Sequence, residues 1–197
     1  MLRFFHSSIQ GLALVFIVST FTINAQTFSN TTVSNYNSWD SQFNFGNFTK
    51  PIAVSGLPTP LGNITGQVVL RQINLQLGTA QGTKGDLSTY TFRLTAPSGQ
   101  SLDFISNPFT TESAPMWINI HFRDDASLER IRDYDAEVQH HFFPFYIGYY
   151  RVENAGSFQS VFNGANPNGN WIFSIKENSS NEISFQKIEL IFGPPVK

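Results

Sequence analysis

The sequence predicts an all-β domain, and three features support this prediction. Runs of alternating apolar and polar residues recur between turn signals, as expected for strands with one buried and one wet face. Phenylalanine alone contributes 20 of the 197 residues, and Phe, Val, Ile and Thr favour pleated, half-buried surfaces. Helical periodicity is confined to the charged segment 126–138, for which a loop is an equal interpretation. We therefore expect a two-sheet sandwich with long loops between some strands.

Five segments carry the strand pattern. They are residues 67–77, 88–96, 116–122, 169–177 and 184–192. Period-2 alternation places every second side chain on the same face, and the apolar set on each strand should face the core. Ile118, Trp171, Phe173 and Leu190 are the core residues that this pattern singles out.

The chain begins with the features of a secretory signal. Arg3 supplies a short positive region, residues 11–23 form an apolar run, and Ala25 offers a small residue for cleavage. The run is short for a membrane span, although an uncleaved anchor is the alternative. We expect residues 1–25 to be removed and the rest to be secreted, without a membrane span. Residues 26–50 are predicted as a lead-in segment, 51–193 as the β-sandwich and 194–197 as a tail.

Composition excludes several functional classes. The formal net charge is −2 and no long basic run occurs, so nucleic-acid binding has little electrostatic support. The chain has no cysteine, which excludes disulfides and zinc–thiolate sites. The fold must therefore be held by its own core, with a hard oxygen-ligated ion such as calcium as the compatible metal.

The sequence does not predict an enzyme. It has no G-x-S-x-G nucleophile elbow, and its histidines are His6, His121, His140 and His141. His121 is opposite in phase to its apolar strand neighbours and is expected to face solvent. His140 and His141 would point to opposite faces of a strand, so a polar loop is the simpler interpretation than a shared metal ion.

Three separated patches resemble the P domain of proprotein convertases. The first runs from Leu70 to Gly99 and contains Gly85-Asp86-Leu87, an alternating strand and the turn Ala96-Pro97-Ser98-Gly99. The second is 120–126, with the acidic pair Asp124-Asp125, and the third is 162–171, FNGANPNGNW, which is similar to the family's F-G-x-x-P-x-G-x-W turn. In this order they cover roughly residues 49–193. The resemblance implies a jelly-roll β-sandwich similar to galactose-binding-like domains.

Calcium is the cofactor that the resemblance implies, because some P domains bind it structurally. Loop carboxylates are suitable ligands, and the candidates are Asp86, Asp124, Asp125 and Glu177. Glu177 stands where the family usually has Asp, and residues 78–84 lack the family's usual His. The alternatives are a turn or backbone cap for Asp86 and a solvated bend for the Asp124-Asp125 pair.

The resemblance also implies a non-catalytic accessory role. In the family, the P domain packs against a subtilisin-like serine protease, stabilising it and tuning its activity. No protease domain fits within this chain, so such an action would be in trans. The alternative is a secreted module that binds carbohydrate or a cell-surface polymer, and a third interpretation is a structural surface protein. The aromatic segment 141–150 is either a binding platform or core packing.

Overall fold

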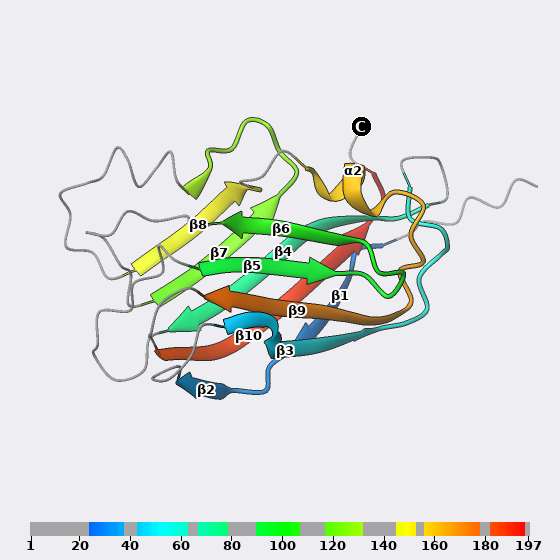
Figure 1. Ribbon diagram of the computed structural model, residues 1–197. Coiled ribbons are helices and arrows are strands. Elements are labelled where there is room, and N and C mark those ends of the chain that lie inside the picture. Colours follow the sequence, from blue (N-terminus) through cyan, green and yellow to red (C-terminus); the bar gives the residue numbers. More distant parts are fainter. Residues whose placement is uncertain are drawn as a thin grey trace, which may run out of the picture.

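The computed structural model describes residues 24–37, 43–62, 67–78, 90–106, 117–131, 145–152, 156–177 and 182–195. These residues form two β-sheets that pack face to face (Figure 1). Sheet A contains β1 (Gln26–Asn30), β2 (Ser34–Asn37), β4 (Val69–Gly78), β7 (Trp117–Arg123), β8 (Phe145–Arg151) and β10 (Glu182–Gly193). Sheet B contains β3 (Phe43–Val54), β5 (Tyr90–Thr95), β6 (Ser101–Ser106) and β9 (Gly169–Glu177).

The strand order alternates between distant parts of the chain. Sheet A runs β1-β10-β4-β7-β8, with β2 paired to the start of β10, and sheet B runs β3-β9-β5-β6. The pairings in both sheets are antiparallel except that of β7 with β8, which is parallel. The short helix α2 (Phe158–Phe162) lies at one end of the sandwich (Figure 1).

Aromatic side chains fill the space between the sheets. Phe104 of sheet B meets Phe122 of sheet A edge to face, with ring centroids 5.2 Å apart. Trp171 of sheet B likewise meets Phe192 of sheet A at 5.4 Å. Such pairs contribute about 0.5–1.5 kcal/mol each beyond the area that they bury. They join the two layers directly, as the composition predicted.

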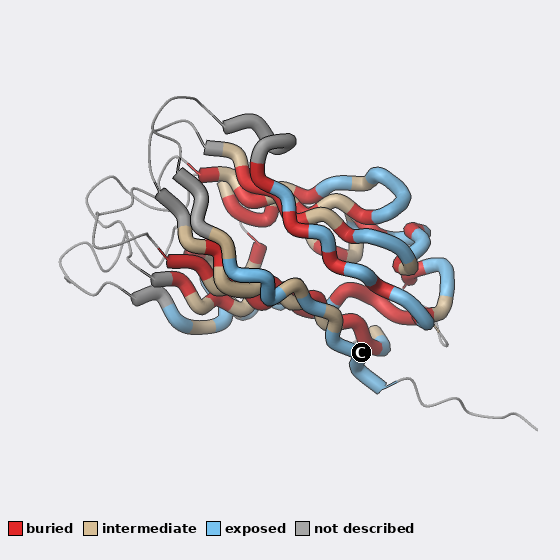
Figure 2. Tube along the Cα trace, turned by 90° about the horizontal axis from the view of Figure 1, so that it is seen from below, coloured by how far each residue is buried: buried red, intermediate tan, exposed pale blue. Residues whose placement is uncertain are grey.

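The five predicted strands are present as β4, β5, β7, β9 and β10. Along much of each strand every second residue is buried, as the alternating pattern predicted (Figure 2). Ile118, Trp171, Phe173 and Leu190, the residues predicted for the core, are fully buried.

The sequence patterns did not single out β6 or β8, and the lead-in segment belongs to the sandwich. β1 pairs with β10, and β3 crosses the predicted boundary at residues 50 and 51 while it pairs with β9. Asn30 Nδ2 donates to Pro51 O over 2.8 Å, and Lys50 Nζ donates to Thr32 O over 3.0 Å. These contacts join the lead-in to sheet B, so the predicted division at residue 50 is not a structural boundary. In the segment considered for a helix, residues 126–128 form a turn and a bend, Ile131 is helical, and residues 132–138 lie outside the described part of the chain.

Candidate functional site

The carboxylate of Asp124 caps helix α2. One oxygen accepts the backbone N–H of Phe158 at 2.7 Å and the other accepts that of Gln159 at 2.9 Å. The first turn of a helix leaves these N–H groups without partners inside the helix. Burial raises the pKa of Asp124 above its ordinary value, although the hydrogen bonds to its carboxylate oppose the shift. Both carboxylate oxygens of Asp124 are therefore engaged by the backbone of the first turn of α2.

Asp125 points to a different partner. Its Oδ1 accepts the backbone N–H of Ser127 at 2.9 Å and the Ser127 hydroxyl at 2.6 Å, which closes a local turn at the surface. These hydrogen bonds lower the pKa of Asp125. The two adjacent carboxylates are thus separately engaged and do not fit a shared ion.

Glu177, another calcium candidate, lies at the opposite end of the sandwich. The backbone of Glu177 ends β9 and pairs with Tyr90, the first residue of β5, whereas Gly169 begins β9 near α2. At about 3.3 Å per residue, the two ends of β9 lie roughly 26 Å apart. Asp86 lies outside the described residues, as do His140 and His141. Asp124 and the end of β9 at Glu177 therefore lie at opposite ends of the sandwich, and the described residues contain no group of three potential metal ligands.

A polar surface that the sequence did not single out covers the outer face of sheet A. The strand register places its side chains in cross-strand rows. Tyr149, His121, Asn74 and Glu189 form one row, Ile147, Asn119, Gln76 and Lys187 form a second, and Arg123 and Gln72 belong to a third. We call this surface, made by these ten residues, the polar face. Alternation predicted that polar side chains would point outward, but only the register shows which of them are neighbours.

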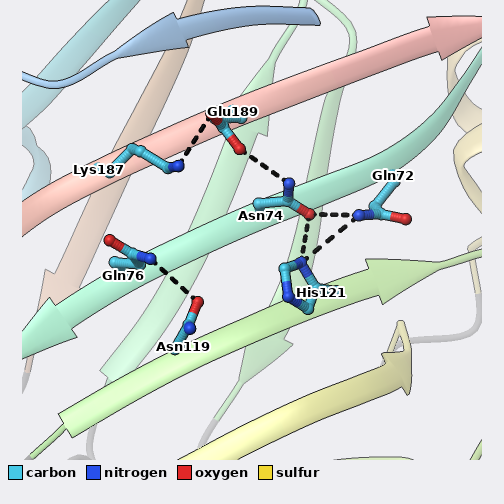
Figure 3. A network of polar contacts seen from close by, with 7 residues as sticks. All are labelled: Gln72, Asn74, Gln76, Asn119, His121, Lys187 and Glu189. Atoms are coloured by element: carbon cyan, nitrogen blue, oxygen red, sulfur yellow. Dashed lines mark hydrogen bonds and ion pairs between the residues drawn. The ribbon is translucent and has the colours of Figure 1, made fainter. Parts of the chain in front are cut away.

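Hydrogen bonds connect the central row across three strands (Figure 3). Asn74 Nδ2 donates to Glu189 Oε2 at 2.9 Å, and Lys187 Nζ meets Glu189 Oε1 at 2.9 Å. Because Asn74 uses its amide nitrogen in this way, its Oδ1 is the acceptor for His121 Nδ1 at 2.6 Å. His121 thus carries its proton on Nδ1, and Nε2 is the acceptor of the neutral ring. The nearby Gln76 donates to Asn119 at 3.2 Å.

His121, Tyr149 and Arg123 form an aromatic and cationic cluster at the β8 edge of the polar face. The rings of His121 and Tyr149 stack with centroids 4.8 Å apart and an interplanar angle of 28°. The guanidinium carbon of Arg123 lies 4.1 Å from the centroid of the Tyr149 ring. Burial and the positive charge of Arg123 lower the pKa of His121, which favours the neutral ring. Tyr149 remains 49% exposed and Ile147 67% exposed.

Described parts of the three patches that resemble the P domain meet at the α2 end of the sandwich. In the third patch, Phe162 packs edge to face on Trp171 at 4.9 Å, and Trp171 Nε1 donates to Pro167 O at 2.7 Å. Gly169 of this patch lies against Pro97 of the first patch. Asp124 of the second patch caps α2, whose last residue is Phe162. Residues far apart in sequence therefore form one connected structural unit.

Comparisons with known proteins give little further information. No protein-family model matches the chain, and no curated protein matches it. Among solved structures, the complex of the Aeromonas sobria serine protease with a chaperone is similar at a TM-score of 0.33 and 13% sequence identity. The match covers 87% of this chain but 28% of that chain, and at this TM-score it carries no argument. None of the described helices is long and apolar enough to cross a membrane.

Proposed function

We propose that this chain is a secreted, non-catalytic accessory module of the P-domain type that acts in trans on a subtilisin-like serine protease. One observation carries the proposal: described residues from each of the three sequence patches that suggested the family lie together at the α2 end. A chance set of short matches would have no reason to meet in space. Here Gly169 contacts Pro97, and Asp124 holds the helix that leads to Phe162.

The strand order supports the jelly-roll form of this proposal. With β2 and β8 set aside, eight strands remain, and sheet A reads β1-β10-β4-β7 while sheet B reads β3-β9-β5-β6. In chain order these are strands one, eight, three and six, opposite strands two, seven, four and five. A jelly roll built from two interleaved Greek keys would have this order, which supports the proposed fold type.

The surroundings of His121 support a non-catalytic role. A serine hydrolase needs a histidine base oriented by a carboxylate beside a serine nucleophile. His121 Nδ1 instead bonds to the amide oxygen of Asn74, and its ring stacks on Tyr149. We expect the purified chain to cleave no casein and to remain unlabelled by a fluorophosphonate probe. Labelling that a single Ser→Ala change abolishes would contradict this part of the proposal.

A capture experiment tests the accessory role directly. The mature chain is immobilised and exposed to the secreted fraction of its source, and the retained proteins are treated with a fluorophosphonate probe. We expect a labelled subtilisin-like protease that heat-unfolded bait does not retain. Addition of the chain should then lengthen the half-life of the isolated protease. Absence of a labelled protease, or an unchanged half-life, would refute the accessory role.

A further inference from the structure

The guanidinium group of Arg123 is held in place before any ligand arrives. Its Nε donates to Gln72 Oε1 at 2.6 Å, and its carbon lies over the Tyr149 ring. Gln72 is itself buried and fixed, because its Nε2 donates to Asn74 Oδ1 at 2.5 Å. Holding Arg123 by Nε leaves the two terminal nitrogens of the guanidinium directed away from this anchor. A pre-positioned fork of this kind favours bidentate binding of a carboxylate.

Asp125 is an acid whose pKa is lowered by hydrogen bonds from Ser127, which its carboxylate already accepts, and also by the positive charge of Arg123. On the polar face, Glu189 is the acidic member and it pairs with Lys187. His121 is held neutral, since burial and Arg123 lower its pKa. The register also pairs Arg123 with Arg151 of β8, so the cationic side chains on this face and its edge, Arg123, Arg151 and Lys187, outnumber the acidic Glu189, although the whole chain has a net charge of −2. An anionic ligand is complementary to this surface.

The neighbours of Arg123 suit a sugar. Tyr149 is half exposed, and the part of its ring that His121 and Arg123 do not cover can pack against the apolar face of a sugar ring. The amides of Gln76 and Asn119 and the Nε2 atom of His121 offer donors and acceptors for hydroxyl groups. These groups lie on adjacent strands of one sheet, so they form an open surface that a polymer can cross.

We propose that the Arg123–Tyr149–His121 cluster binds an acidic polysaccharide through its uronate sugars. The uronate carboxylate pairs with the terminal nitrogens of Arg123, and the sugar ring packs on the exposed part of Tyr149. Neighbouring hydroxyls bond to the amides of the polar face. Arg123 directly precedes Asp124, which caps α2, so this cluster adjoins the α2 end that carries the accessory proposal. The two proposals name different ligands, a polysaccharide and a protease, so either can fail without the other.

Calorimetric titration with oligogalacturonate tests the proposal, with the methyl-esterified oligomer as a ligand of the same shape without the charge. We expect binding of the acid form that weakens with added salt, and at least about tenfold weaker binding of the ester. Arg123→Gln and Tyr149→Ala should each weaken binding by about tenfold or more. Arg123→Lys keeps the positive charge but lacks the two parallel N–H donors of the guanidinium, so it should also bind more weakly than the natural chain.

Lys176→Gln is the matched control, because Lys176 is a cation on β9 of the other sheet. It should leave affinity unchanged, and melting curves should show that each variant is folded. Three results would overturn the proposal: no binding of oligogalacturonate, equal binding of its ester, or full affinity in both Arg123 variants. Equally tight binding of polyglutamate that competes with the sugar would assign the site to acidic peptides instead.

Discussion

Gly169 at the start of β9 lies directly against the ring of Pro97, in the turn between β5 and β6. A Cβ atom placed on Gly169 would come within 2.9 Å of the Pro97 ring. Gly169 also has a φ of +131°, which side chains rarely adopt. Both features require glycine here, and they explain why a glycine and a proline distant in sequence belong to one pattern.

Gly169→Ala should therefore destabilise the fold by about 1–3 kcal/mol, the usual cost of a strained backbone, increased by the contact with Pro97. Gly99→Ala is the matched control, because Gly99 has a φ of +92° with no atom within 4 Å of its Cβ position. Chemical denaturation of both variants measures the difference. A smaller loss in Gly169→Ala than in Gly99→Ala would show that the Pro97 contact is unimportant.

Asp124→Ala should remove a helix cap that serves two N–H groups. We expect a loss of about 1–2 kcal/mol, or roughly 2–8 °C in melting midpoint. Because both oxygens bond to the chain, the loss should be the same in calcium and in chelator. Asp125→Ala, which affects a surface turn, should change the midpoint less. A loss that appears only in calcium would instead make Asp124 a metal ligand.

Structural calcium binding remains a prediction, and two of its four candidate ligands, Asp86 and the side chain of Glu177, lie outside the described residues. At one hundred times its dissociation constant, calcium would stabilise the native state by about 2.7 kcal/mol, or roughly 5–10 °C. Asp86→Asn should abolish this gain. Thermal melts with calcium and with chelator measure it, and identical curves for the natural chain would leave Asp86 as a turn residue.

His121 should make stability depend on pH. Its pKa is lowered in the folded chain, so the unfolded chain binds more protons between that lowered value and about 6.5. The free energy of unfolding should therefore rise with pH through this window. Above about pH 6.5 the whole contribution of His121 to stability should be present. His121→Gln should flatten the rise. Chemical denaturation of the natural chain and of His121→Gln between pH 5 and 8 tests this. The difference between their two pH profiles gives the contribution of His121 apart from that of the other histidines. Parallel curves would contradict it.

Export should leave the fold intact. Cleavage after Ala25 would make Gln26 the first residue, and Gln26 is also the first residue of β1, where it pairs with Phe192. We expect the N-terminal sequence of secreted material to begin at Gln26. A soluble cytoplasmic form that retains Met1 would contradict the predicted signal.

The sequence by itself determined the fold class and much of the core. Alternation in 116–122 and 184–192 predicted which side chains turn inward, and Ile118 and Leu190 are fully buried. It also located the patches that meet at the α2 end. These are local signals, because the period of two is a property of each strand alone.

Only the tertiary structure decided the polar face and the role of Asp124. Tyr149 reaches His121 through the parallel pairing of β7 with β8, and no periodicity predicts which strands will be neighbours. Asn74, a polar residue on the outward side of its strand, is nearly buried because Gln72, His121 and Glu189 surround it. Asp124 caps a helix that begins 34 residues later. These relationships depend on register and long-range packing, which bring together residues that the sequence keeps apart.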